Sequence, residues 1–156
     1  MNPRVGLGFD IHPYSDDPGR PLVLGGVTLE GRGLAGHSDA DAVAHAIADA
    51  LLGAAGLGDI GQHFPDDDPA YAGVDSLELL ARVVLSVSER FEIGNVDVTV
   101  VLEAPKLSPH RDAIQTRLED VVGAPVNVKA KRAESLGAIG RGEGVACFAV
   151  ALLVPR

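Results

Sequence analysis

Three side chains in the first third of the chain have the types and spacing of a metal site. Asp10 and His12 are two residues apart in an apolar segment, and strand side chains at that spacing lie on one face. Pro13 favours an extended backbone at His12. Four residues separate Asp41 from His45 in an alanine-rich segment, so we expect both on one helix face. A carboxylate and two imidazoles that converge from a strand and a helix are typical of a catalytic zinc centre with one open position.

The same residues have a simpler structural interpretation. The D-x-H pattern also occurs by chance, and Asp10 and His12 can form a hydrogen-bonded pair at a strand end. His45 would then be half-buried on its helix. Asp49, one turn after His45, either orients that imidazole or is an exposed helix carboxylate. Spacing alone leaves these alternatives open.

Three other segments carry groups that bind phosphate or a hard cation. Residues 140–144 combine flexible backbone amides with the guanidinium of Arg141. Lys106 follows a predicted strand, and residues 131–134 combine two cations with a carboxylate that can bind a second metal ion. Each segment also has an interpretation without a ligand. Arg141 can form a salt bridge at an interface, and the cations of residues 131–134 can be solvated.

Composition restricts the class of protein. A chain of 156 residues, 46% hydrophobic and 22% charged, is typical of one globular domain, which we expect to span residues 1–156. The net charge of −9 argues against a nucleic-acid partner, although local cations can still bind a phosphorylated ligand.

Cys147 is the only cysteine, which excludes an intrachain disulfide, and its apolar surroundings predict a buried thiol. We see no signal peptide and no apolar run near the roughly 18 residues of a membrane helix, and therefore expect a cytoplasmic protein without a membrane partner.

The hydrophobic pattern predicts the elements that position these side chains. Strands are expected over residues 5–12, 21–27, 95–102, 126–130 and 145–154. Helices are expected from residue 38 or 39 to about 53, from 75 or 76 to before 94, and from 108 to 123. Residues 56–73 form a long irregular stretch, for which a functional loop and a solvated acidic loop are equally open. The order of elements predicts an α+β fold with a mixed β-sheet and helices on one face.

Taken together, the motifs resemble one enzyme family over nearly the whole chain. They are Gly8-Phe9-Asp10-Ile11-His12, His37-Ser38-Asp39-x-Asp41-x-x-x-His45, Leu57-Gly58-Asp59-Ile60-Gly61, Phe64-Pro65-Asp66-x-Asp68, Ala104-Pro105-Lys106 and Gly140-Arg141-Gly142-Glu143-Gly144. In this combination and order the chain resembles the 2-C-methyl-D-erythritol 2,4-cyclodiphosphate synthases of the non-mevalonate isoprenoid pathway.

The resemblance implies a lyase that works as a homotrimer with active sites between subunits. It implies Zn²⁺ held by Asp10, His12 and His45, and a second divalent ion, Mg²⁺ or Mn²⁺, near Glu134. The implied substrate is 4-diphosphocytidyl-2-C-methyl-D-erythritol 2-phosphate, whose 2-phosphate oxygen attacks the β-phosphorus and releases CMP. Such a reaction needs positioning and charge neutralisation rather than a protein nucleophile.

The resemblance also implies roles for individual residues. The residues with implied catalytic roles are Arg132 and His37, and His37 would stabilise charge on the phosphate oxygens. The erythritol and its phosphates would be held by Ser38, Asp59, Ile60, Gly61, Phe64, Pro65, Asp66, Asp67 and Asp68. The cytidine diphosphate side would be held by Ala104, Pro105, Lys106, Leu107, Lys131 and Ala133, and Arg141 is a further expected substrate-binding residue.

Arg132 departs from the family, which usually has a threonine credited with transition-state stabilisation at this position. We expect Arg132 to face the cytidine diphosphate and give a cationic contact to phosphate, although it can also point away. Two other functions remain open: a zinc-dependent phosphohydrolase that uses metal-bound water, and a catalytically silent trimer that binds a nucleotide or isoprenoid phosphate.

Overall fold

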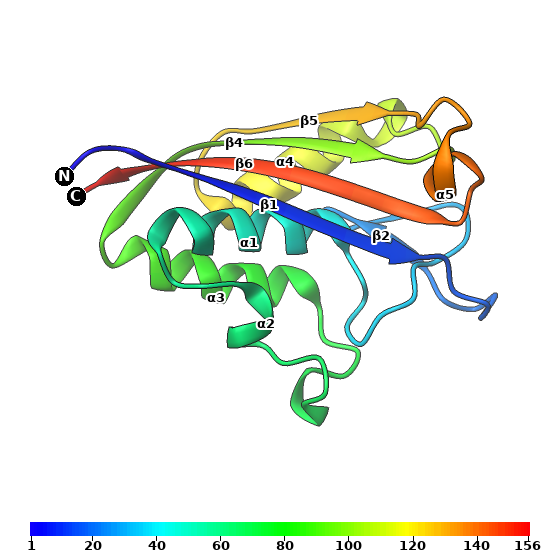
Figure 1. Cartoon of the computed structure of the whole chain (residues 1–156), viewed down its shortest axis with the longest axis horizontal. Coiled ribbons are helices and arrows are strands. Elements are labelled where there is room, and N and C mark those ends of the chain that lie inside the picture. The colour runs from blue at the N-terminus through cyan, green and yellow to red at the C-terminus, as the bar shows by residue number, and fades with distance from the viewer.

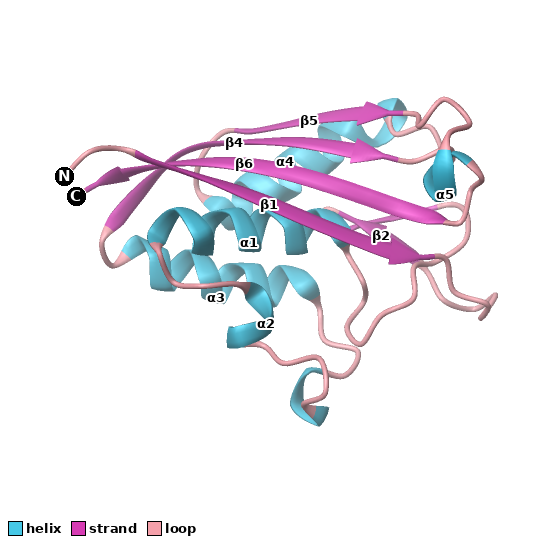
Figure 2. Cartoon of the chain, viewed as in Figure 1, coloured by secondary structure: helices cyan, strands magenta, loops and turns pink.

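The structure, a computed structural model that describes residues 1–156, contains a mixed sheet with its helices on one face (Figures 1 and 2). Four strands lie in the order β1 (Arg4–Pro13), β6 (Gly144–Pro155), β4 (Phe91–Val101) and β5 (Val126–Lys131). The pairs β1–β6 and β6–β4 are antiparallel, whereas β4–β5 is parallel. The α+β class and the mixed sheet predicted from the sequence are therefore confirmed.

Three longer helices cover the sheet: α1 (Ala42–Ala55), α3 (Ser76–Ser88) and α4 (Arg111–Val122). Helix α1 lies between the sheet and α3, and most of its residues are buried, because it packs against β1 and β6 on one side and α3 on the other. Its alanines allow close packing, and Cys147 of β6 is buried beneath it. Burial raises the pKa of the Cys147 thiol well above its usual value, as expected for an unreactive core cysteine.

The contact between β1 and α1 depends on two glycines. A Cβ atom on Gly8 would lie 1.8 Å from the carbonyl oxygen of Ala46, and one on Gly6 would lie 1.9 Å from that of Ala50. The strand and the helix therefore touch backbone to backbone. His45 directly precedes Ala46 in α1. The close approach of strand and helix therefore places Asp10 and His12 of β1 next to His45.

One predicted strand is wrong, because residues 21–27 form a hairpin rather than a single strand. Strands β2 (Leu22–Leu24) and β3 (Val27–Leu29) pair antiparallel through Gly25 and Gly26. Both glycines have positive φ angles, 60° and 73°, which a two-residue hairpin turn requires.

The predicted start of α1 is also wrong, because the helix begins at Ala42 and Asp41 is its N-cap. The Asp41 carboxylate accepts hydrogen bonds from the backbone amides of Val43 and Ala44, and from those of the β2–β3 turn. Burial raises the pKa of Asp41 to about 6 even though these amides favour the charged form. Asp41 therefore ties the hairpin to α1 and does not share a helix face with His45.

The other boundaries differ in smaller ways. The stretch 56–73 is not wholly irregular, since it contains α2 (Ile60–His63) and a 3₁₀ turn, Pro69–Tyr71. Another 3₁₀ turn, Ser108–His110, precedes α4, and a short helix α5 (Gly137–Gly140) precedes β6. No helix is both long and apolar enough to cross a membrane, and the cytoplasmic location stays a prediction.

The sheet face opposite the helices is uncovered, and it is apolar where β1 and β6 form it, whereas Asp97, Asn127 and Lys129 make the β4–β5 part polar. Its large exposed apolar side chains come from the edge strand β1 and from β6, and we call them the open sheet face: Val5, Leu7, Phe9, Ile11, Phe148, Val150 and Val154. The rings of Phe9 and Phe148 lie side by side on it, with centroids 5.0 Å apart. An apolar surface of this extent is typical of a contact with another protein surface.

Candidate metal centre and flanking cavities

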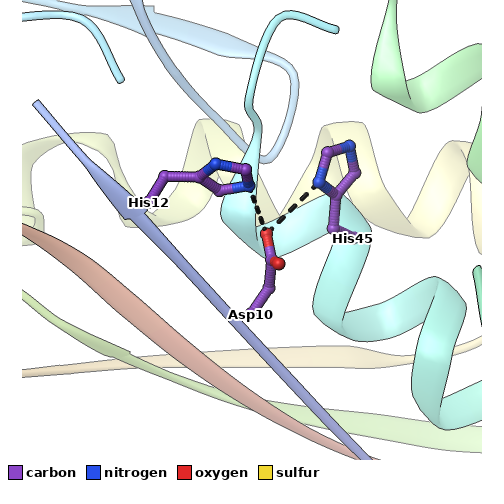
Figure 3. Close-up of side chains that lie close together, drawn as sticks. All are labelled: Asp10, His12 and His45. Atoms are coloured by element: carbon purple, nitrogen blue, oxygen red, sulfur yellow. Dashed lines mark hydrogen bonds and ion pairs between the residues drawn. The ribbon is translucent and has the colours of Figure 1, made fainter. Parts of the chain in front are cut away.

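Asp10 and His12 of β1 and His45 of α1 converge on one point (Figure 3). His12 Nε2 lies 2.7 Å and His45 Nδ1 lies 3.2 Å from the same oxygen, Asp10 Oδ2. One ligand atom from each side chain lies within 4.8 Å of the others, so the three groups could share one metal ion. The strand and helix predicted from the sequence do bring these three residues together.

Each imidazole points one nitrogen to this place, because its other nitrogen is engaged by a neighbouring group. His12 Nδ1 lies 2.9 Å from the Ala35 carbonyl oxygen, which can only accept, so Nδ1 carries the proton. His12 Nε2 is buried and has no hydrogen-bond partner, since its close approach to Asp10 is not aligned as a hydrogen bond. A metal ion would satisfy this buried nitrogen.

His45 is oriented in the same manner by Ser76. The Ser76 hydroxyl donates to the Asp39 carboxylate, and its oxygen lies 2.8 Å from His45 Nε2. The hydroxyl therefore accepts the Nε2 proton, so that Nδ1, which lies 3.2 Å from Asp10 Oδ2, is the nitrogen with which His45 would bind a metal ion. Ser38 Oγ lies 3.2 Å from the same Nε2. The donor set of one carboxylate and two such imidazoles fits Zn²⁺ or a similar divalent transition metal.

Charges at the site favour a cation in the middle. Burial disfavours a charged Asp10, but the two imidazoles outweigh it and hold the pKa of the carboxyl below its usual value. Burial likewise disfavours a charged His12, but the Asp10 carboxylate outweighs it and raises the pKa of the imidazole. The negative charge that favours a proton on His12 would also favour a divalent metal ion between the three side chains.

Sequence reasoning missed several residues that support the site. Ser76 carries only the signal of a helix start, and its contact with His45 spans 31 positions. The Arg20 guanidinium donates to the carbonyls of Leu34, Gly36 and Ser38, at 3.2 Å for Gly36 and 2.6 Å for Ser38, and so fixes the segment before α1. No local pattern around Arg20 predicts this role.

Asp49 fits neither of the interpretations that the sequence left open. Its Oδ1 accepts the backbone amide of Ile60 at 3.1 Å, so Asp49 joins α1 to α2. This bond holds the loop that follows α1 beside the metal-binding residues.

A cavity of about 530 Å³ opens beside the metal-binding residues. It contains most of the side chains expected to hold the erythritol and its phosphates, together with three further residues, Gly36, Tyr71 and Leu79. The expected ones that line it are His37, Ser38, Ile60, Gly61, Phe64, Pro65, Asp66 and Asp67. Asp59 and Asp68 do not line it; their side chains cap α2 and the following 3₁₀ turn, and the Asp68 carbonyl binds His37 Nε2 at 2.8 Å.

A second cavity, of about 380 Å³, lies where β4 and β5 end. The predicted residues that line it are Ala104, Pro105, Lys106, Leu107, Lys131 and Arg132, and the structure adds Glu103 and Arg111 among others. Its four cationic side chains suit phosphate groups, in contrast to the net charge of −9 for the whole chain.

Besides Asp59 and Asp68, three other predicted residues lie outside both cavities. Ala133 donates its backbone amide to Glu103 at 2.7 Å. Glu134 has a left-handed backbone, with φ of 52°, and belongs to no group of three metal-binding side chains. Arg141 pairs with Glu143 at 2.6 Å, as its interpretation without a ligand allowed, although within this chain rather than across an interface. No residue lines both cavities, so the single chain does not join the two halves of the expected site.

Residues 3–154 match the YgbB family. The chain is 52% identical to the 2-C-methyl-D-erythritol 2,4-cyclodiphosphate synthase of Burkholderia thailandensis, covering 99% of this chain and 97% of that one. It is 54% identical to the bifunctional enzyme IspD/IspF of Anaeromyxobacter dehalogenans over 96% of this chain, but spans only 39% of that longer protein. Among solved structures it resembles a CDP complex of IspF from Plasmodium falciparum, with a TM-score of 0.86, 36% identity and coverage of 99% and 97%. Sequence, fold and the arrangement of the metal-binding residues agree, and the chain belongs to the YgbB family, that of the 2-C-methyl-D-erythritol 2,4-cyclodiphosphate synthases.

Proposed function

We propose that this protein converts 4-diphosphocytidyl-2-C-methyl-D-erythritol 2-phosphate to 2-C-methyl-D-erythritol 2,4-cyclodiphosphate and CMP. The observation that carries the proposal is the three-ligand group of Asp10, His12 and His45 beside a cavity that contains most of the expected phosphate-side residues. The 2-phosphate oxygen forms a bond to the β-phosphorus, the bond from that phosphorus to the bridging oxygen breaks, and CMP leaves with this oxygen. The nucleophile belongs to the substrate, so the protein has only to position the reacting phosphate groups and to neutralise their negative charge.

The chain's own residues divide this task between the two cavities. Asp10, His12 and His45 would hold Zn²⁺, which acts as a Lewis acid and template for the phosphate oxygens. His37, fixed by the Asp68 carbonyl, lines the same cavity and stabilises charge on those oxygens. The cation-rich second cavity binds the cytidine diphosphate, with Mg²⁺ or Mn²⁺ near Glu134; the CDP in the Plasmodium falciparum complex supports this assignment.

The active assembly is a homotrimer in which the first cavity of one subunit meets the second cavity of its neighbour. Two observations support this proposal. The cavities share no residue within one chain, although the substrate must touch both. The open sheet face leaves large apolar side chains uncovered, and burying them between copies would stabilise a closed cyclic assembly.

The test is to incubate the zinc-loaded protein and Mg²⁺ with the diphosphocytidyl substrate and to follow the phosphorus NMR spectrum. We expect CMP and a cyclic diphosphate in equal amounts. Inorganic phosphate instead would indicate the phosphohydrolase, and unchanged substrate would indicate a silent binding protein.

A His45→Ala variant should lose zinc and turnover but keep its fold, because the imidazole borders an open cavity rather than the apolar core. Zinc content, circular dichroism and CMP release check this prediction. His63→Ala, which removes an exposed imidazole from α2, is the matched control and should keep all three properties. An unfolded His45→Ala variant would show that His45 is structural.

A further inference from the structure

The second cavity contains one carboxylate among its four cations. Glu103, at the end of β4, lines it together with Lys106, Arg111, Lys131 and Arg132. A carboxylate in a cavity that binds a diphosphate repels the ligand unless another group balances its charge. The position of Glu103 therefore needs an explanation beyond packing.

The Glu103 side chain is largely buried and binds two neighbours at once. Its Oε1 accepts the backbone amide of Ala133 at 2.7 Å. Its Oε2 accepts from the guanidinium of Arg132, at 3.2 Å for Nε and 3.0 Å for Nη2. The side chain of Glu103 is only 15% exposed, whereas that of Arg132 is 71% exposed, so the carboxylate lies beneath the guanidinium.

This arrangement has two physical consequences. The bond to Ala133 fixes the turn after β5, and the pair of bonds to Arg132 fixes one edge of a side chain that is otherwise flexible. A guanidinium has five N–H groups, and Glu103 uses two, so three remain for a ligand. Arg132 also cancels the negative charge of Glu103 within the cavity.

We infer that Glu103 is a positioning residue that orients Arg132 and the amide of Ala133 toward the phosphates of the bound cytidine nucleotide. Glu103 and Arg132 therefore act as a matched pair: Glu103 without Arg132 is worse for ligand binding than the absence of both. The inference rests on the proposed function, since it assigns the cytidine diphosphate to this cavity.

A double-mutant cycle on CDP affinity tests the inference, with Glu103→Gln, Arg132→Thr and the double variant, each measured by calorimetry. Arg132→Thr leaves an unbalanced carboxylate and should weaken CDP binding by about tenfold. Glu103→Gln in the wild-type background releases the guanidinium and should weaken it several-fold. In the Arg132→Thr background the same Glu103→Gln change removes the repulsion and should strengthen CDP binding.

This reversal of sign separates a positioning role from a structural one, because a merely structural glutamate would weaken binding in both backgrounds. Glu103→Gln keeps an acceptor for the Ala133 amide, and unchanged thermal midpoints would confirm intact folds. The catalytic efficiencies of the wild type and the variants should follow the same order as their CDP affinities, chiefly through changes in KM. Glu78→Gln, in the exposed Glu78–Arg82 pair of α3, is the control for charge alone and should leave CDP affinity unchanged.

The outcomes also distinguish the inference from the proposed function. Equal losses from Glu103→Gln in both backgrounds, with a wild-type protein that binds CDP and releases CMP, would overturn the inference alone. A wild-type protein that neither binds CDP nor releases CMP would overturn the proposed function, and the inference with it.

Discussion

At the scale of single residues, the metal-binding group owes its form to hydrogen bonds made by atoms that face away from the metal. His12 and His45 can each carry the proton on either ring nitrogen, and the Ala35 carbonyl and the Ser76 hydroxyl select between these two tautomers. The Asp39 carboxylate in turn orients the Ser76 hydroxyl, so that its oxygen accepts rather than donates. The three side chains are thereby already oriented for the metal ion that we propose they hold.

We expect Ser76→Ala to lower zinc affinity by roughly 10- to 100-fold, because His45 loses the acceptor that fixes its tautomer and ring orientation. A competition titration with a chromophoric chelator measures the change. Ser86→Ala, at an exposed position of the same helix, should leave affinity unchanged. If both variants bind zinc as the wild type does, the Ser76 contact has no role in metal binding.

At the scale of elements, the relation between β1 and α1 determines whether the site exists. Two ligands come from the strand and one from the helix, and no connection between the two elements is short. Their separation is set by Gly8 and Gly6, which let the strand backbone touch the helix backbone. The alanines of α1 complete a contact that larger side chains would push apart.

Gly8→Ala should destabilise the protein by about 3 kcal/mol or more, since the new methyl group would meet a backbone carbonyl that cannot rotate away. It should also weaken zinc binding by moving Asp10 and His12 away from His45. Urea unfolding and a zinc titration measure both effects.

Gly53→Ala is the matched control for this prediction. Gly53 lies on the exposed side of α1 with no atom near its missing Cβ, so alanine should stabilise the helix by about 0.5–1 kcal/mol. A Gly8→Ala variant as stable as the wild type would show that strand and helix can separate without cost.

At the scale of the whole molecule, the layers of the fold leave two problems that a single chain does not solve. The helices cover only one face of the sheet, which leaves the apolar side chains of β1 and β6 in contact with water (Figure 2). The two cavities share no residue, although the proposed substrate would have to place phosphate groups in both. The homotrimer that we propose, with the open sheet face buried between copies, would solve both problems.

Leu7→Asp should therefore break the assembly, because a charge on the open sheet face cannot be buried between subunits. Light scattering should change from three times the chain mass of 16.1 kDa to a single mass, and turnover should be lost. Leu85→Asp on α3 is the matched control, since Leu85 is 71% and Leu7 66% exposed but they lie in opposite layers. A fully active monomer in either variant would contradict the proposed trimer.

Short-range periodicity in the sequence was enough to predict the class of fold and the strand and helix that carry Asp10, His12 and His45, whereas spacing alone left their role as metal ligands open. Asp10 and His12 share a strand face two residues apart, and the alternation of valines marks β4 in the same way. The sequence also contained the signal for the hairpin, Gly25-Gly26, but the apolar residues on either side of it favoured a single strand.

The polar groups that support the site could not be predicted from the sequence, because long-range contacts of the fold select them. Ser76 is 31 residues from His45, Glu103 is 29 from Arg132, and Arg20 is 18 from Ser38. Asp41 shows the same limit, because its spacing matched that of a ligand partner while its carboxylate is occupied by amides of a distant turn. A side chain's own sequence neighbourhood fixes which face of an element it occupies, whereas its hydrogen-bond partner depends on which other element packs against that face.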